Sequence, residues 1–391
     1  MKTIAVIFGG RSTEHDVSIV TAIASIIKPL KMTKNYKIMP VYITKSGEWY
    51  ADTELGDISL YSSGAIEQWL ARHKPLSIQL SGGLGFLAPS RLGAKAIKVD
   101  LVFPAMHGTH GEDGELMGVL EMAGVPYVGC GPAASAIAMD KVLAKQVTEA
   151  NGVKSTPWIW CSQDEIAQDI DAVMDRCKDL QFPIFVKPAH LGSSIGITRA
   201  VNEIELQNGL ELAAHYDTKI IIEQGVKNLV EVTLPIIGNS QLCPALLEQP
   251  LNNEEGFFGF DTKYMHGGKK GGAKNSAKMG KGAVGAQGYS QLPADLPKNV
   301  YDRAVEVGCA AYRAVGCEGI ARIDMLIDSK RQEVYFNEIN PLPGSLYAHN
   351  WRQAGLSGVE LVEELVRLAS ESYDRKKATD TIFETNFLKQ F

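Results

Sequence analysis

Apolar strand-like runs alternate with helix-like patterns from the start of the chain, and this alternation constrains the fold more than any other feature. The run "TIAVIF" is followed by a helical pattern from about residue 16, and "KIMPVYI" and "VDLVFPAMHG" precede a helical pattern near "GELMGVLEMAG". Such alternation predicts a mainly parallel sheet with helices on its faces. The N-terminal part is therefore expected to be a doubly wound α/β domain.

Two further units are expected after this one. A helix in "AIAMDKVLAKQVTEANG", ended by Gly152, precedes the short strands "FPIFVKPA", "GITRA" and "KIIIEQ" and a helix in "EIELQNGLELAAHY". Next, "EVTLPIIG" and "QLCPALLEQ" look antiparallel, and a long loop leads to a helix from about 297 to 315. The strands "GIARIDMLID" and "EVYFNEIN" and a helix near "GVELVEELVRLAS" follow. A chain of 391 residues is long enough for three domains, placed at 1–139, 140–223 and 224–391.

The charge and the cysteines exclude several classes of protein. A net charge of -6 and a pI of about 5.8 argue against a general nucleic-acid-binding surface, which needs a basic face. No apolar run is long enough to span a bilayer, and the run after Lys2 is too short for a signal peptide, so a cytoplasmic protein without a membrane partner is expected. None of the six cysteines forms a C-x-x-C pair, which favours isolated buried thiols.

The stretch "FGGRSTEHDVS", residues 8 to 18, follows the first strand directly. Its two glycines predict a tight turn, and Ser12 or Thr13 is a suitable cap for the next helix. Turns at the carboxyl ends of strands line the ligand crevice of open α/β sheets. Arg11 stands where a dinucleotide fingerprint requires its second glycine, so that motif is excluded. From this stretch alone, an ordinary turn remains an alternative.

The segment "FVKPAHLGSSIGI", residues 185 to 197, has the chemistry of a phosphate-binding loop. Lys187 supplies a point charge, and the amides and hydroxyls of Gly192, Ser193 and Ser194 are open to close approach by an anion. No G-x-x-x-x-G-K-[ST] motif occurs in the chain, so a nucleotide must be held without a P-loop. A plain hairpin is the alternative for this segment alone.

Acidic residues recur on two strands near the C-terminal end. Residues i and i+2 of a strand share a face, so Arg322 lies beside Asp324 and Glu338 beside Asn340. Three oxygen ligands, Asp324, Glu338 and Asn340, suit Mg²⁺ between nucleotide phosphates, while a structural ion pair is the alternative. In the following "PLPGS" turn, Gly344 exposes an amide that can stabilise an oxyanion.

The segment "GGKKGGAKNSAKMGKGAVGAQG", residues 267–288, has an unusual composition. It holds eight glycines, five lysines and no acid, so it cannot form a packed core. Its place between two strand-rich regions favours a lid that meets phosphates, with a flexible linker as the alternative.

Taken in order, these motifs resemble those of the D-alanine:D-alanine ligases, members of the ATP-grasp superfamily. The resemblance covers residues 4 to about 369 and rests on "FGGRSTEHDVS", "FPAMHGTHGEDGELMGVLEMAGVPYVGCG", "MDK", "VKPAHLGSSIG", "EVT", "TKY", "GIARID" and "NEINPLPG". It implies an ATP-grasp fold, in which an N-terminal α/β domain precedes two lobes that clamp ATP. It also implies Mg²⁺ or Mn²⁺, with two ions, and a homodimer.

The activity implied by the resemblance is a two-step ligation for peptidoglycan synthesis. ATP phosphorylates the carboxylate of one D-alanine, and the amine of a second attacks the acyl phosphate. Carried over by motif, the ATP-binding residues are Lys141, Lys187, Ser194, Glu223 at the adenine edge, Glu231 at the ribose, and Lys263. Glu14 would hold the ammonium of the first substrate, and Ser193 and Tyr264 would hydrogen-bond with Glu14. Arg322 and the Gly344 amide would stabilise the intermediate. His107 would line the pocket.

The segment "SLYAHNW" departs from the family pattern and leaves the acceptor open. His349 and Asn350 stand where the family has a serine and a leucine near the second substrate's carboxylate, and Pro341 stands where threonine is common. The retained Tyr264 favours an amine acceptor. One alternative is an ATP-grasp ligase that joins D-alanine or another amino acid to a different acceptor. A non-catalytic nucleotide-binding regulator is another.

Overall fold

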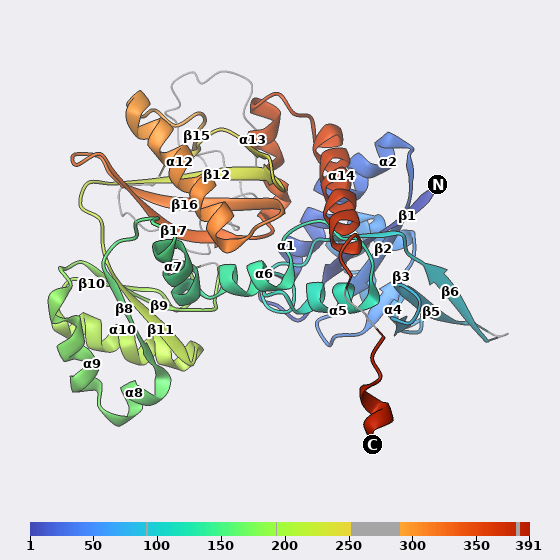
Figure 1. Cartoon of the computed structure of the whole chain (residues 1–391), viewed down its shortest axis with the longest axis horizontal. Helices are drawn as coiled ribbons and strands as arrows, with labels where there is room; N and C mark the ends of the chain where they lie inside the picture. The colour runs from blue at the N-terminus through green and yellow to red at the C-terminus, as the bar shows by residue number, and fades with distance from the viewer. Residues whose placement is uncertain (91–92, 193, 252–289, 381–383) are drawn as a thin grey trace.

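The structure is a computed structural model that describes residues 1–90, 93–192, 194–251, 290–380 and 384–391. Within these ranges a parallel sheet at one end of the molecule is joined to two antiparallel sheets at the other (Figure 1). Ser193, Lys263, Tyr264 and the expected lid at 267–288 lie outside the described residues.

The N-terminal sheet has the strand order β3-β2-β1-β7. Its central strand β1 (Lys2–Gly9) runs parallel to β2 (Tyr36–Ile43) and β7 (Leu101–Pro104), and β3 (Trp49–Ala51) adds an antiparallel edge. The expected mainly parallel sheet is therefore confirmed.

Alternate residues of β1 face two different cores, because side chains alternate between the faces of a strand. Val6 and Phe8 pack with a helical segment made of α1 (His15–Val20), the π-helical η1 (Thr21–Ile27) and α2 (Lys28–Thr33). Ala5 and Ile7 pack on the other face with α5 (Glu115–Ala123). Helices on both faces make this domain doubly wound, as expected.

The segment between β3 and β7 was not expected to form elements, yet it does. It contains η2 (Glu54–Gly56), α3 (Ile58–Ser62), α4 (Ile66–Leu70), β4 (Ser77–Gln79), β5 (Gly85–Ser90) and β6 (Gly93–Lys98). The three strands form an antiparallel ribbon that projects from the domain in Figure 1. The exposed β4 offers no apolar alternation, which explains why the sequence did not reveal it.

The middle of the chain forms the antiparallel sheet β10-β9-β11-β8. Its strands are β8 (Trp158–Ser162), β9 (Ile184–Pro188), β10 (Thr198–Ala200) and β11 (Lys219–Gln224). Three helices and a 3₁₀ turn accompany it: α8 (Gln163–Gln168), α9 (Ile170–Arg176), η3 (Cys177–Asp179) and α10 (Glu203–Tyr216). Val173, Val186 and Leu210 belong to the core between the helices and the strands.

The C-terminal part forms the antiparallel sheet β13-β12-β16-β17. Its strands are β12 (Leu229–Gly238), β13 (Leu242–Pro244), β16 (Gly319–Asp328) and β17 (Glu333–Asn340), and α12 (Lys298–Val315) packs on it. The antiparallel prediction is confirmed by the pairing of Ile236 with Pro244. The remaining elements are β14 (Gln249–Pro250), β15 (Ser290–Gln291), η4 (Gly344–Tyr347), α13 (Ala348–Gln353), α14 (Gly358–Lys377) and η5 (Phe387–Gln390).

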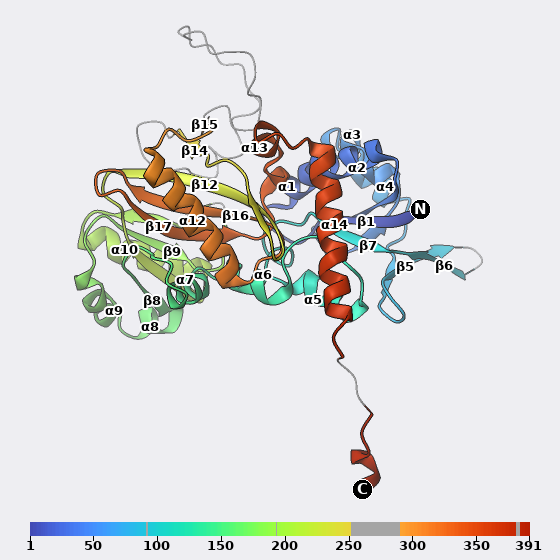
Figure 2. The ribbon, with the colours of Figure 1, turned by 45° about the horizontal axis from the view of Figure 1, so that its top comes forward.

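Two helices, one at each of two expected domain ends, pack against a different domain from the one to which the expected boundaries assign them. The helix expected before Gly152 is two helices, α6 (Pro132–Met139) and α7 (Lys141–Ala150), because the Asp140 side chain caps α7. α7 packs on β17 and α12, and α14 returns to α2 beside the N-terminal sheet (Figure 2). The boundaries 139/140 and 223/224 stay predictions. In the described part of the chain, none of the helices combines the length and apolarity needed to cross a membrane.

Candidate active site

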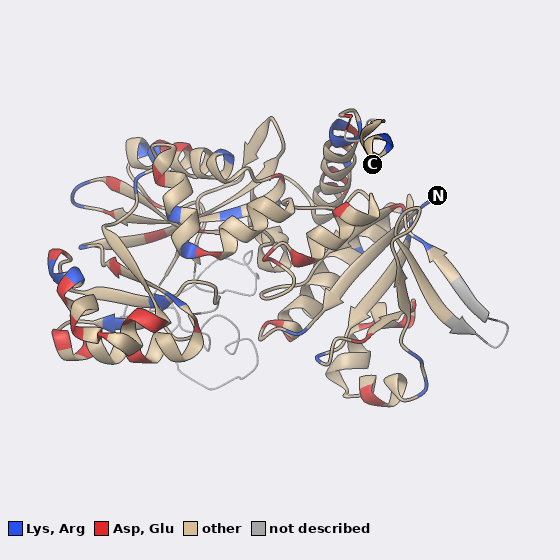
Figure 3. Ribbon diagram, turned by 60° about the horizontal axis from the view of Figure 1, so that its bottom comes forward, with Lys and Arg blue, Asp and Glu red and all other residues tan. Residues whose placement is uncertain are grey.

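A cavity opens between the two antiparallel sheets, lined by strands from both. Seven residues singled out from the sequence line it: Lys141, Lys187, Ser194, Glu223, Glu231, Asp324 and Glu338. Gln224, Gly225 and Val226 line it where the chain leaves β11. Figure 3 shows charged residues of both signs on the strands of these sheets and also on the outer helices. The structure therefore brings together residues that lie up to 197 positions apart.

A buried group of three charges lies on the β9 and β11 side of this cavity. Glu223 Oε2 is 2.5 Å from Lys187 Nζ, and Glu223 Oε1 is 2.6 Å from Lys145 Nζ. Burial alone would raise the pKa of Glu223, but the two ammonium groups lower it to about 2. Two cations and one carboxylate leave one net positive charge in a buried place. This arrangement favours an anionic ligand such as a phosphate.

Lys145 was missed in the sequence, although a signal was present. It follows Lys141 by four residues in α7, so both lysines lie on one face of the helix. Lys141 Nζ donates to Leu191 O at 2.7 Å and lies 3.8 Å from Glu338 Oε2. One helix face thus reaches both the glycine-serine loop and the acidic strand.

The two acidic strands pair so that their functional residues lie opposite one another. In the register of β16 and β17, Arg322 faces Asn340 and Asp324 faces Glu338. A bulge follows this pair, and the extra residue Asn337 lines the cavity with its Oδ1 3.5 Å from Lys187 Nζ. The expected neighbourhood of these four side chains is confirmed by the register.

Arg322 and Asp324 form a two-pronged ion pair. Arg322 Nε lies 2.7 Å from Asp324 Oδ1, and Nη2 lies 2.5 Å from Oδ2. Burial opposes the charge of Arg322, but the Asp324 carboxylate outweighs it and holds the guanidinium pKa well above its ordinary value. Arg322 is therefore a permanent cation on β16, opposite Asn340 of β17.

Asp324, Glu338 and Asn340 have the donor chemistry of a divalent-cation site. With its amide turned to suit its neighbours, Asn340 donates from nitrogen to Leu342 O at 3.0 Å and to Glu112 Oε1 at 2.9 Å. Its oxygen lies beside the two carboxylates of the paired strands in the β16–β17 register. Oxygen ligands of this kind fit Mg²⁺ or Mn²⁺.

The N-terminal turn meets the glycine-serine loop at Glu14. A Cβ atom placed on Gly192 would lie 3.7 Å from Glu14 Oε2, and one on Gly108 would lie 3.3 Å from the same oxygen. Glu14 is only 9% exposed, and Ser12 Oγ accepts a hydrogen bond from its backbone nitrogen. The first turn therefore presents a carboxylate between two loops, and its role at a ligand crevice stays a prediction.

His107 is buried behind Glu14. Its Nε2 lies 2.9 Å from Thr21 Oγ1, and its Nδ1 lies 3.8 Å from Glu112 Oε1. Burial lowers the pKa of His107, but the carboxylates of Glu112 and Glu14 outweigh burial and raise it. Glu112 and Thr21 were not singled out from the sequence, because their role depends on contacts between distant segments.

The turn after Gly344 has an unusual backbone. Ser345, Leu346 and Tyr347 have φ angles of 52°, 53° and 52°, the left-handed region, which costs about 1–2 kcal/mol for each such residue. Ser345 N donates to Thr21 Oγ1 at 3.0 Å, which ties this turn to the N-terminal domain. Strain of this kind concentrates at functional sites, where the surrounding structure maintains it.

His349 and Asn350 lie in different surroundings. His349 Nε2 lies 2.8 Å from Glu248 Oε2, and the histidine side chain remains 27% exposed. Asn350 is fully buried, and its amide bonds to the backbone N and O of Leu246. The structure thus leaves His349 partly exposed and holds Asn350 in buried hydrogen bonds.

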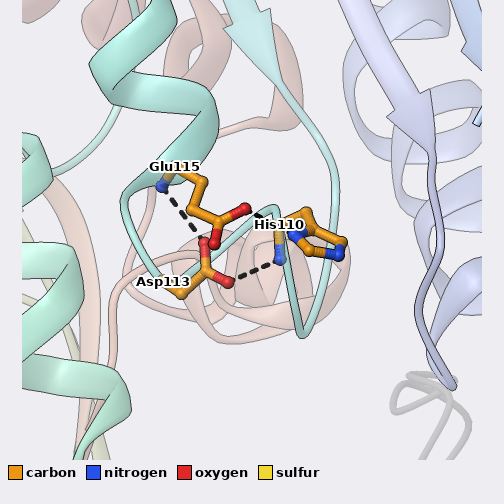
Figure 4. A group of neighbouring side chains, drawn as sticks. All are labelled: His110, Asp113 and Glu115. Atoms are coloured by element: carbon orange, nitrogen blue, oxygen red, sulfur yellow. Dashed lines mark hydrogen bonds and ion pairs between the residues drawn. The ribbon is translucent and has the colours of Figure 1, made fainter.

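A further cluster of potential metal ligands lies before α5. His110, Asp113 and Glu115 approach one another there, as Figure 4 shows. Asp113 accepts hydrogen bonds from the backbone nitrogens of His110 and Glu115, and the His110 ring contacts Glu115. These bonds account for the cluster as the hydrogen bonding of a tight loop.

Comparisons with known proteins agree along the chain. The family model described as "D-ala D-ala ligase N-terminus" matches residues 3–130, and "D-ala D-ala ligase C-terminus" matches residues 147–367. The chain is 34% identical to a D-alanine–D-alanine ligase of Acetivibrio thermocellus, over 95% of this chain and 97% of the relative. It is 32% identical to one of Enterococcus hirae, over 98% of this chain and 99% of that protein.

Solved structures give the same result. The crystal structure of the VanG D-Ala:D-Ser ligase from Enterococcus faecalis matches with a TM-score of 0.77 and 30% identity, over 94% of this chain and 99% of that one. The D-alanine–D-alanine ligase from Coxiella burnetii matches with a TM-score of 0.76 and 25% identity, over 96% and 97%.

Proposed function

This chain belongs to the D-alanine–D-alanine ligase family, and from that membership and the site geometry we propose that it uses ATP to join two D-alanine molecules for peptidoglycan synthesis. The fold is accordingly that of an ATP-grasp enzyme. The observation that carries the proposal is the cavity between the two antiparallel sheets. One side holds a buried group with a net positive charge, and on the other side Asp324 and Glu338 line the cavity, with Arg322 and Asn340 two residues away on the same strands.

The residues of the cavity suit the first step, the transfer of a phosphoryl group to a carboxylate. Lys141 and Lys187, with the loop around Ser194, would hold the phosphates of ATP. Glu223 and Glu231 would contact the adenine edge and the ribose. Because Glu223 is already ionised by its lysine partners, it would act as a hydrogen-bond acceptor for a nucleoside. The outcome of this step is an acyl phosphate of the first D-alanine and ADP.

In the second step, the amine of the second D-alanine attacks the acyl phosphate. The ammonium first loses one proton to water to give the attacking amine; a C–N bond then forms, the nitrogen loses a second proton to water, and the C–O bond to phosphate breaks as inorganic phosphate leaves. Negative charge develops on the carbonyl oxygen during this attack, and the Arg322 guanidinium and the Gly344 amide would stabilise it. Glu14 would hold the first substrate's ammonium between the loops of Gly108 and Gly192.

Asp324, Glu338 and Asn340 would hold Mg²⁺ or Mn²⁺, and we propose two ions. Bound there, the metal would neutralise charge on the phosphate oxygens. The buried Glu112 orients the Asn340 amide and so prepares its oxygen as a ligand. Ser193, Lys263 and Tyr264, which lie outside the described residues, keep the roles that the sequence suggests as proposals.

A substrate screen tests the proposed function. ADP release is measured with single amino acids and with pairs, and the products are identified by mass spectrometry. We expect D-alanine alone to support ADP release together with D-alanyl-D-alanine, whereas L-alanine should support neither. If none of the amino acids tested supports ADP release, the chain is not a ligase of these substrates. Nucleotide binding without any turnover would then favour a regulator.

A second candidate function, ligation of D-alanine to a different acceptor, is favoured by a specific observation. His349 belongs to the segment where the sequence departs from the family, and its half-buried ring contacts Glu248. One similar structure is a D-Ala:D-Ser ligase. The screen therefore includes D-serine and D-lactate beside D-alanine as second substrates. A mixed product formed in preference to D-alanyl-D-alanine would establish this second function.

We further propose that the chain acts in the cytoplasm as a homodimer on small amino acids, without nucleic acid or membrane partners. The net charge of -6 supports the lack of a nucleic-acid partner. Light scattering during gel filtration tests the oligomeric state directly. A monomer at assay concentrations that retains full activity would contradict the dimer proposal.

A further inference from the structure

Arg322 is held on a second side by a residue to which no role has been given so far. The Tyr347 ring lies over the guanidinium, with its centroid 5.3 Å from Arg322 Cζ. Asp324 already holds the edge of the same guanidinium through two hydrogen bonds. A guanidinium paired at its edge and held over an aromatic ring has few orientations left.

Tyr347 is itself fixed by its neighbours. It is 8% exposed, and its ring also contacts the His349 ring at a centroid distance of 5.0 Å. Its hydroxyl lies 3.5 Å from Thr233 Oγ1, at the limit of a hydrogen bond. The ring, rather than the hydroxyl, therefore makes the close contacts.

The backbone explains how Tyr347 reaches Arg322. Three consecutive left-handed residues, Ser345 to Tyr347, fold the chain back immediately after Gly344. Leu346 is fully buried, and Ser345 N is bonded to Thr21, so the turn is anchored on both sides. A tyrosine three residues after Gly344 is thereby returned to the strand that carries Arg322.

We propose that Tyr347 is a positioning residue that holds the Arg322 guanidinium in a fixed relation to the Gly344 amide. This proposal rests on the proposed function, because those two groups are the ones expected to stabilise the charged intermediate. Tyr347 joins them into one rigid unit, since its ring lies over the first and it belongs to the same turn as the second. Its contribution is expected in the turnover number rather than in ATP binding.

The test compares Tyr347→Leu and Tyr347→Phe with the wild type. We expect Tyr347→Leu to lower kcat by at least about tenfold while the KM for ATP changes by less than about twofold. Tyr347→Phe keeps the ring and should retain most of kcat. Tyr335→Leu is the matched control, because it removes a similarly buried tyrosine ring, which is 9% exposed. The Tyr335 ring also contacts a cation, since Lys154 Nζ lies 5.0 Å from its centroid.

If Tyr347→Leu lowers kcat no more than Tyr335→Leu does, at comparable melting temperatures, the proposal is wrong. It is also wrong if Tyr347→Phe is as damaging as Tyr347→Leu, because the hydroxyl would then be the important group. Either result leaves the proposed function intact as long as the wild type ligates D-alanine.

A spectroscopic measurement decides the question independently of activity. In ¹⁵N-labelled protein, the Arg322 Nε–H resonance is assigned by its loss in Arg322→Lys. An aromatic ring over the guanidinium should shift this resonance upfield, and the shift should persist in Tyr347→Phe and disappear in Tyr347→Leu. An unshifted resonance in the wild type would overturn the proposal, whether or not the enzyme accepts D-alanine.

Discussion

Glu338 lies opposite Asp324 in the pairing of β16 with β17, and its side chain faces the cavity. Glu338→Gln keeps the shape of the side chain but removes the charge that a divalent cation requires. We expect kcat to fall by at least about a hundredfold while the melting temperature stays close to that of the wild type.

Glu333→Gln is the matched control for this change. It makes the same substitution on the same strand, where Glu333 pairs with the exposed Lys154 at 3.1 Å. Surface ion pairs of this kind contribute about 0–1 kcal/mol, so activity should be unaffected. Near-normal turnover of Glu338→Gln at saturating Mg²⁺ would show that Glu338 is not a metal ligand.

Lys145 offers a second test at the level of one residue. Lys145→Met removes one of the two cations around Glu223 and makes the buried group neutral as a whole. We expect ATP affinity, measured by calorimetry, to fall at least about tenfold. The free energy of unfolding should fall by about 1–3 kcal/mol, since Glu223 keeps Lys187 as its partner. An unchanged ATP affinity, as expected for the surface control Lys154→Met, would exclude a role for this charge.

The site residues differ in how well the sequence revealed them. Arg322, Asp324, Glu338 and Asn340 follow a two-residue period on strands, so their common face could be predicted from spacing alone. The role of Thr21 could not, because its partners are Ser345 and His107, which are 324 and 86 residues away. Sequence spacing indicates which residues are neighbours within one helix or strand, but it does not indicate contacts between different elements.

At the level of elements, the loop after β9 is tied down by His190. The His190 ring lies 3.3 Å from Asp140 Oδ2 and 3.0 Å from Asp217 Oδ1, and Lys219 contacts the same Asp140 oxygen at 2.6 Å. Hydrogen bonds with Asp140 and then Asp217 raise the pKa of His190 to about 9. One charged histidine thus joins the end of β9, the start of α7 and the turn before β11.

This arrangement predicts a pH dependence of stability. A pKa raised from 6.5 to about 9 means that the stabilisation is fully present below pH 6.5 and is lost as the pH rises through about 9. His190→Gln should therefore lower the melting temperature most at pH 6, and the difference from the wild type should shrink towards pH 10. Thermal unfolding across this range measures it, and a constant difference would refute the role of the charge.

Elements with a strong apolar pattern were predictable, and short ones were not. β1, β16 and β17 lie where apolar periodicity placed them. The break between α6 and α7 was missed because Asp140 reads as part of one amphipathic run, although its side chain caps α7. Strand β4 was missed because all three of its residues are exposed and give no apolar alternation.

At the scale of the whole molecule, Thr21 joins three distant parts of the chain. Its Oγ1 contacts the Ser345 nitrogen of the turn and the His107 ring of the N-terminal domain. Thr21→Val keeps the shape but cannot accept a hydrogen bond. We expect the free energy of unfolding to fall by about 1 kcal/mol and kcat to fall by about tenfold, with little change in the KM for ATP.

Thr148→Val is the matched control for this prediction. Thr148 is equally buried, and its hydroxyl donates within α7 to Ala144 O and not to the turn. Thr148→Val should lower the free energy of unfolding by a similar amount and leave kcat unchanged. If both variants retain full turnover, the bond between the N-terminal domain and the turn has no part in catalysis.

The return of α14 to the N-terminal sheet bears on how the chain folds during its synthesis. The core around Val6 and Phe8 includes Leu361, Leu365 and Ala369 from this helix. The N-terminal domain therefore keeps an open apolar face until α14 has been synthesised. Chains truncated before α14 should expose that face and aggregate, because the N-terminal domain completes its core only when α14 packs against it.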